Sequence, residues 1–535
     1  MNKKYLSKVV AIVVSMMLSV SFVGCNKTEK TTSKSGEEVG GNFNPTGYPI
    51  VNEEITIRAF TQIDPQSKDF NEMKILKDLK EKTGINVVYE CISGSIWNEK
   101  KNLVLASNEL PDIFLGGGLS DSDVIKYGSQ GVFIPLEDWI DQYAVNIKKV
   151  FEEDPSVKKS CTAADGHIYT LPYVDGYEPE DVTNHMFINK TWLEKLGLSV
   201  PTTTDEFYDV LKAFKEKDPN GNGEKDEIPF TYRVGNVYNG DFSLSGAFGV
   251  LDGPEHVMIK DNKMVFSPME EGYKEYIQWT QKLYGEGLID KEIFTQDQGQ
   301  YLAKGKMDVV GGFVIYSSDN MVGEERADKD FMVLQPLEGP NGDRLWGRYV
   351  KGIRPHKVAI TKENQNVEAT IRWIDEFFDE EFGVESHLGE IGKVILKEGD
   401  KYKVATPPEG VTAAQFKFEN SAGPFAPGIV SKEVYRNRLI QNKSAERKTK
   451  AYELYDEFAT QNPLPIMSFT NAQLNEIATI KADIDTYVEE MKAKWITGQS
   501  NIEKDWEDYK NTLKKMQVDR YVELYQEAYD LYQKQ

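Results

Sequence analysis

The spacing of apolar residues changes repeatedly along the chain between two and about 3.6 positions, which predicts strands interleaved with helices. In residues 69–83 apolar side chains recur at helical spacing, and Gly84 follows as a residue type that ends helices. The pattern predicts strands over 55–60, 85–89 and 112–115 and helices over 69–83 and 97–107, the second with Leu103 and Val104 facing inward. A β-α-β-α-β order is typical of a parallel, doubly wound sheet.

The alternation continues through the middle of the chain and gives way to helices near its end. The elements predicted there are a strand over 167–172, a helix over 189–196 ended by Gly197, and a helix over 204–217 capped by Thr204. From about residue 445 long helices predominate, and we expect these large side chains on them to pack inward: Trp495, Trp506, Tyr509, Leu513, Tyr521, Leu524 and Tyr525. Residues 48–535 are too many for one hydrophobic core, so at least two lobes are expected.

Three consecutive glycines, Gly116–Gly118, follow the strand predicted over 112–115. Open α/β sheets bind ligands at the carboxyl ends of their strands, which makes this position notable. The run lacks the GxGxxG spacing of a dinucleotide-binding turn. We therefore interpret it as a turn or as a close approach of backbone to another group.

The first 25 residues have the order of a secretory signal. A head with Lys3, Lys4 and Lys8 precedes an apolar run too short for a permanent membrane helix, and Gly24-Cys25 ends it. This ending resembles the lipobox of bacterial lipoproteins, which implies a diacylated Cys25 as membrane anchor. The alternative is an ordinary secreted protein whose cleavage site includes Cys25. Residues 26–47 are polar and glycine-rich, as expected of a disordered tether.

Charge and cysteine content exclude several classes of protein. The net charge of −23 argues against binding nucleic acid through a bulk electrostatic field, although local donors could still hold an anionic ligand. Beyond Cys25 the chain has only Cys91 and Cys161, too few for a disulfide scaffold. They could pair, but we favour two separate buried thiols.

One loop has the composition of a calcium site. It places oxygen side chains at alternate positions around Gly223, and calcium takes six to eight hard oxygen ligands around such a turn. The candidate ligands, with a structural role for Ca²⁺, are Asp218, Asn220, Asn222, Glu224, Asp226 and Glu227. The loop resembles the first half of an EF-hand but has Pro229 at position twelve, so Glu227 would have to replace the usual glutamate. The alternative is a polar turn without metal.

Several segments together resemble the extracellular solute-binding lipoproteins of ABC importers, in the group that binds oligosaccharides. The likeness is carried in order by residues 105–114, 131–138, 165–172, 187–206, 495–498 and 519–526. The calcium loop resembles that of the alginate-oligosaccharide-binding members. The order spans nearly the whole mature chain.

The resemblance implies an α/β fold of two lobes, like that of periplasmic binding proteins, with discontinuous lobes, a hinge, a central cleft and a helix-rich C-terminus. We expect a signal peptide over 1–24, a lipidated tether over 25–47 and a two-lobe domain over 48–535. The first lobe would begin with 48–170 and the second with about 171–315, and later segments would cross between the lobes. The implied partners are an oligosaccharide and the ABC permease, with a monomeric protein on the outer face of the cell membrane.

Sugar sites need flat aromatic faces and fixed hydrogen-bonding groups. Candidate ligand-binding residues near predicted strand ends or in polar loops are Trp97, Tyr173, Tyr316, Trp346, Arg348 and Tyr349. A secreted polysaccharide-active enzyme, either a glycoside hydrolase or a lyase, and a carbohydrate-sensing receptor are the alternatives. No sequence feature marks a catalytic carboxylate pair, and there is no HExxH, GxSxG or P-loop motif, so we expect no enzyme activity.

Overall fold

A six-stranded sheet organises the first part of the chain. The computed structural model describes residues 41–107 and 109–535, so the predicted signal, Cys25 and the predicted tether up to residue 40 lie outside the described residues. The end of the predicted tether is corrected: Phe43 bridges to Val51 and packs on Tyr143, and Arg372 donates to the carbonyls of Asn44 and Gly47, so residues 42–47 belong to the folded domain. β1 (Ile55–Ile63) pairs in parallel with β2 (Ile85–Ser93) and with β3 (Ile113–Leu115), as predicted. The complete order is β13-β4-β10-β3-β1-β2.

The sheet is mixed rather than wholly parallel. β10 (Ile353–Ile360) runs antiparallel to both β3 and β4 (Thr170–Asp175), while β13 (Gly428–Val430) runs parallel to β4. β10 enters the sheet from a distant part of the chain rather than through a βαβ crossover. The local β-α-β pattern therefore did not reveal its direction.

The helices beside this sheet follow the sequence pattern with two corrections. The helix predicted over 69–83 is a 3₁₀ turn followed by α1 (Lys74–Thr83), which Gly84 ends with a left-handed φ of 77°. In α2 (Trp97–Ala106) the predicted inward Leu103 is 59% exposed, whereas Leu105 is buried. The buried residues of α2 are Trp97, Lys101 and Leu105, which lie four positions apart on one side of the helix. The helix therefore turns a different side inward than predicted.

A second core forms around three antiparallel strands in the order β8-β5-β9: β8 (Gly312–Ile315), β5 (His185–Asn189) and β9 (Phe331–Leu334). α7 (Lys190–Leu196) ends at Gly197, as predicted. α8 (Thr204–Glu216) is capped by Thr203 rather than Thr204, because the Thr203 side chain accepts from the Glu206 amide.

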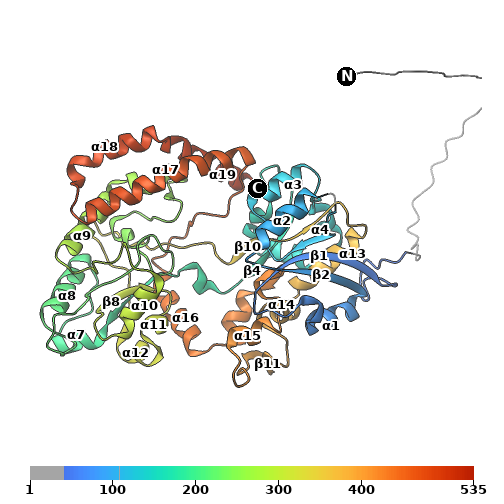
Figure 1. Cartoon of the computed structure of the whole chain (residues 1–535), viewed down its shortest axis with the longest axis horizontal. Helices are drawn as coiled ribbons and strands as arrows, with labels where there is room; N and C mark the ends of the chain where they lie inside the picture. The colour runs from blue at the N-terminus through green and yellow to red at the C-terminus, as the bar shows by residue number, and fades with distance from the viewer. Residues whose placement is uncertain (1–40, 108) are drawn as a thin grey trace, which may run out of the picture. The chain divides into compact units, whose positions relative to one another are not determined.

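Long helices complete the second core. They are α9 (Glu271–Gly285), α17 (Asn471–Ile496), α18 (Ile502–Lys515) and α19 (Val518–Lys534). Figure 1 shows the last three, in red, running side by side. All seven large side chains predicted to pack inward on these C-terminal helices are buried.

The remaining helices and strands connect or cover these sheets. They are α3 (Asp121–Ser129), α4 (Glu137–Tyr143), α5 (Val145–Glu153), α6 (Pro155–Cys161), β6 (Val257–Lys260), β7 (Lys263–Phe266), α10 (Gln298–Lys306), α11 (Ser318–Val322), α12 (Glu324–Lys329), α13 (Val367–Asp375), α14 (Glu380–Leu388), β11 (Ile395–Glu398), β12 (Lys401–Val404), α15 (Ala413–Phe418), β14 (Leu439–Ile440) and α16 (Lys443–Tyr455).

The two largest groups of buried apolar side chains belong to different parts of the chain. One surrounds the six-stranded sheet, and the other surrounds β5 and the C-terminal helices. Cys91 and Cys161 are both free thiols, as predicted; Cys161 is buried as expected, whereas Cys91 is only half-buried. Within residues 41–107 and 109–535, none of the helices combines the length and apolar character needed to cross a bilayer.

Candidate ligand-binding site

Three segments of the described chain, which we call the crossing segments, lead from one core to the other: residues 175–185, 347–352 and 431–451. Backbone hydrogen bonds tie them together. The Asp175 amide donates to the Gly352 carbonyl at 2.7 Å, and the Gly176 amide donates to the Val430 carbonyl, just before the third segment, at 2.8 Å. The two cores are therefore connected by segments that lie next to one another and are hydrogen-bonded together.

Three pockets are built on or beside the crossing segments. The largest, of about 570 Å³, is lined by Asp175, Asp181, Arg348 and Tyr349 among others. A second, of about 440 Å³, combines three tyrosines with polar side chains, and its lining includes Tyr177, Tyr435, Tyr452, Gln441 and Thr449. A third, of about 330 Å³, again includes Arg348 and Tyr349 beside apolar residues. Aromatic faces interspersed with hydrogen-bonding groups suit a carbohydrate.

Arg348 and Tyr349 are the predicted ligand residues that line these pockets. The Arg348 guanidinium pairs with Asp456 and donates to the Thr460 carbonyl at 3.1 Å, so its position is fixed. The Tyr349 hydroxyl is buried without a hydrogen-bond partner among the described residues. Burial raises the pKa of Tyr349, so its hydroxyl stays protonated and available as a donor. Their contact with ligand stays a prediction.

Tyr316 directly follows β8 and belongs to an aromatic and cationic group that the sequence pattern only partly revealed. The Lys448 ammonium lies 4.4 Å from the centre of its ring, and the Tyr238 ring lies 6.3 Å away. Tyr238 is 43% exposed, and the Lys351 ammonium lies 3.8 Å from its ring centre. Burial lowers the pKa of Lys351 to about 8. Tyr238 was missed because its loop has no regular spacing; its only signal is an aromatic residue beside Asn-Gly.

Trp97, Tyr173 and Trp346 are buried, and protein groups cover their rings. The Trp97 indole donates to the Gly118 carbonyl at 3.1 Å and packs on Phe60. Tyr173 stacks on His387 with the ring centres 3.9 Å apart. The Trp346 indole donates to the Asn184 side chain at 3.2 Å. In this arrangement all three act in packing and hydrogen bonding, and ligand contact by them stays a prediction.

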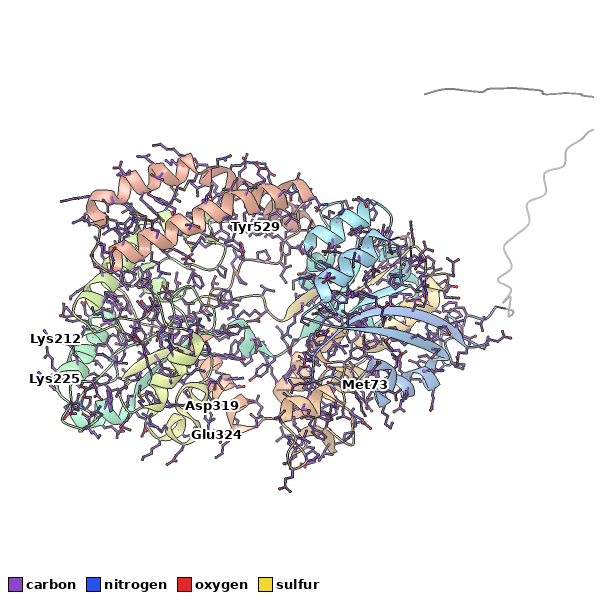
Figure 2. All side chains as sticks on the ribbon, viewed as in Figure 1. Met73, Lys212, Lys225, Asp319, Glu324 and Tyr529 are labelled. Carbon is purple, nitrogen blue, oxygen red and sulfur yellow. The ribbon has the colours of Figure 1, made fainter. Side chains whose placement is uncertain are left out.

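The predicted calcium loop lies between α8 and β8, near Lys225 in Figure 2. The Asp218 carboxylate accepts from the amides of Gly221, Asn222 and Gly223 at 2.9 to 3.2 Å. Left-handed φ values of 77° at Gly221 and 80° at Gly223 allow this tight fold. The loop therefore has the turn that the sequence predicted.

Whether the loop can hold a metal ion depends on which of its oxygen atoms are available as ligands. The amide groups of Asn220 and Asn222 donate to the Asp226 carboxylate. One Glu227 carboxylate oxygen is buried without a partner, and the pKa of Glu227 is raised by burial and by the charges of Asp226 and Asp218. No cluster of three or more His, Cys, Asp or Glu side chains suited to a metal occurs in the described part of the chain. The mixture of carboxylate, amide and carbonyl oxygens nevertheless fits calcium.

Known proteins share both the sequence and the fold. The profile of the bacterial extracellular solute-binding protein family matches residues 68–382, more than half of the chain. FusA of Streptococcus pneumoniae, a fructooligosaccharide ABC transporter substrate-binding protein, is 35% identical over 503 residues that cover 91% of this chain and 92% of FusA. The structure of FusA with kestose gives a TM-score of 0.72 and covers 90% of this chain and 99% of that one. A FusA EF-hand mutant with fructo-nystose, 34% identical, gives 0.72 at the same coverage.

Two further solved structures share the fold. An HMO-binding, ABC-transporter-associated solute-binding protein of Bifidobacterium longum infantis is 25% identical, with a TM-score of 0.79 and coverage of 90% of this chain and 99% of that one. The alginate-binding protein AlgQ2 without calcium is 25% identical, with a TM-score of 0.64 and coverage of 91% and 100%. The predicted periplasmic-binding-protein-like fold is thus confirmed. The chain belongs to the family of bacterial extracellular solute-binding proteins.

Proposed function

We propose that this protein captures an oligosaccharide at the crossing segments and delivers it to the permease of an ABC importer. The observation that carries the proposal is the similarity to FusA along almost the full length of both chains. The tyrosine-lined pocket of about 440 Å³ supplies surfaces of the kind that sugars need. Ligand contacts from both cores would stabilise a closed form and shift an existing open–closed equilibrium.

The two-lobe organisation would follow the two cores, with the first lobe beginning over residues 48–170 and the second over about 171–315. The crossing segments would act as the hinge. We propose that Cys25 carries the lipid, that the residues after it up to about residue 41 form the tether, and that the monomer works at the extracellular face of the cell membrane. The lipobox-like sequence supports this placement.

Calcium would stabilise the loop over 218–227 in a structural role. The side chains of Asp218, Asn220, Asn222, Asp226 and Glu227 would hold it together with the Glu224 carbonyl. The support is the buried, unpartnered oxygen of Glu227 and the EF-hand named for the FusA mutant. The cation would neutralise carboxylates that otherwise repel one another.

Binding and turnover distinguish transport from catalysis. The full-length mature protein would be incubated with fructo-oligosaccharides and other glycans, with tryptophan fluorescence for binding, small-angle scattering for closure and chromatography for products. We expect a fluorescence change and a smaller radius of gyration, with every glycan recovered intact. Glycan cleavage would replace the proposal with a polysaccharide-active enzyme, and binding without compaction would refute the closure mechanism.

A further inference from the structure

Two lysines beside the six-stranded sheet lack an acidic partner. Lys357 lies on β10 and Lys417 on α15, and both are part-buried. Within the described residues, neither ammonium group makes a hydrogen bond or an ion pair to protein. The nearby carboxylate of Asp175 already pairs with Arg354 at 3.1 Å. Burial and the charge of Arg354 lower the pKa of Lys357 to about 8.

The glycine turn after β3 adds backbone donors beside Lys357. Gly116, Gly117 and Gly118 all have left-handed φ, at 105°, 79° and 86°. A Cβ atom at Gly117 would lie 2.7 Å from the Lys357 ammonium nitrogen, so only glycine lets that ammonium lie over the turn. The amides of Gly117 and Gly118 donate to no other described residue. Successive amides in a left-handed turn form a concave site that favours anions.

This concentration of donors contrasts with the acidity of the chain as a whole, whose net charge is −23. The charge of Arg354 acts on both Lys357 and Lys417. Cations that repel one another and are partly removed from water destabilise the unliganded protein. Such an arrangement is typical of a ligand site, where the missing negative charge arrives with the ligand. The arrangement also lies at the carboxyl ends of β1 and β3, where open α/β sheets bind ligands.

We propose that Lys357, Lys417, Arg354 and the Gly116–Gly118 turn form an anion subsite, and that the captured oligosaccharide carries a carboxylate, sulfate or phosphate group there. This inference rests on the proposed capture of an oligosaccharide and narrows it to an acidic sugar. The ammonium and guanidinium groups would donate charge-assisted hydrogen bonds to the anion. The open amides would complete its coordination.

The test compares acidic trisaccharides, uronate and sulfated, with neutral counterparts of equal length, including methyl-esterified uronates and kestose. Affinities would be measured by calorimetry for the wild type, Lys357→Met, Lys417→Met and the control Lys403→Met. Lys403 lies on β12, is half-exposed and pairs with Glu398, so its loss removes the same charge away from the subsite. We expect tighter binding of an acidic sugar, weakened about tenfold or more in the two subsite variants and unchanged in the control.

The outcomes separate the two proposals. If a neutral sugar binds as tightly as its acidic counterpart, or if the subsite variants keep full affinity for the acid, the anion subsite is refuted while sugar capture stands. If no sugar of either series binds, the proposed function fails together with the inference. Melting curves of both variants would verify that they are folded.

Discussion

The ion pair between Lys492 on α17 and Asp241 offers a sharp test of what holds the second core together. The Lys492 ammonium contacts the Asp241 carboxylate, and their side chains are 7% and 0% exposed. Asp241 also accepts from the Tyr276 hydroxyl at 3.1 Å and from the Gly235 amide at 3.0 Å. One buried carboxylate thus joins its own loop, residues 235–241, and α9 to the long helix α17.

Replacing Lys492 with methionine would leave that carboxylate charged and buried. Removing one member of a buried pair costs about 3–5 kcal/mol, because the remaining charge keeps its desolvation penalty without its partner. Burial raises the pKa of Asp241, but Lys492 outweighs this effect and holds it below its ordinary value. The ion pair therefore contributes to the free energy of unfolding of the wild type at pH values above about 3.9, the pKa of Asp241 in the unfolded chain. This contribution is lost as the pH falls through the lower pKa of Asp241 in the folded protein.

The assay is urea unfolding at pH 7, followed by tryptophan fluorescence. Lys494→Met is the matched control, because Lys494 lies on the same helix, is 42% exposed and pairs with the exposed Glu490. It should lose no more than about 1 kcal/mol. The double variant Asp241→Asn/Lys492→Met should recover much of the loss, since no charge stays buried. Equal losses for the two lysine variants, or a double variant no more stable than Lys492→Met, would refute this reasoning.

Three further predictions concern the loop, the lysine and the aromatic group. If free calcium is present at a hundred times its Kd, its removal by a chelator should lower the free energy of unfolding by about 2.7 kcal/mol and lower the melting temperature accordingly. In calorimetry, the Glu227→Gln variant should no longer respond to chelation. Because the pKa of Lys357 is about 8 rather than its ordinary 10.5, the unfolded chain binds more protons between these values, and stability should rise with pH there. Lys357→Met should reduce that rise, to which Lys351 with its pKa of about 8 also contributes, and should stabilise the unliganded protein at pH 7; an unchanged pH profile would contradict it. Tyr238→Ala and Tyr316→Ala should each weaken sugar binding about tenfold, ~1.4 kcal/mol, with little effect of Tyr238→Ala on melting because that ring is 43% exposed. Full affinity in both variants would place the sugar elsewhere.

The elements that depend on local signals were predictable. Gly84 and Gly197 both end their helices in the left-handed conformation that the sequence indicated. The sequence indicated a turn or a close approach of backbone at Gly116–Gly118, and the structure shows both: all three have left-handed φ, and a Cβ at Gly116 would lie 2.9 Å from backbone atoms of Gln62. The two helix ends are each decided by the backbone conformation of the glycine itself.

Features set by distant contacts were not predictable. β10 pairs with β3 and β4 across long separations in sequence, so no local period discloses its direction. Trp97 and Trp346 looked like open stacking faces because they stand beside polar loops, but tertiary packing covers both. Tyr238 is the converse case: no regular spacing in its sequence neighbourhood marked it, and only folding brings it beside Tyr316 and Lys351. Burial of a single aromatic ring depends on the whole core and not on its flanking residues.

The hydrogen bonds between the crossing segments have a mechanical consequence. A single flexible connection would let the two cores swivel and twist freely, whereas parallel connections bonded to one another permit rotation about few axes. The hydrogen bonds from Asp175 to Gly352 and from Gly176 to Val430 would hold neighbouring connections together, so that they bend about one common hinge axis. A side chain at Gly176 would meet backbone atoms of Ser431 and Lys432 within 2.5 Å. A substitution there would therefore push two of the crossing segments apart and hinder the movement of both.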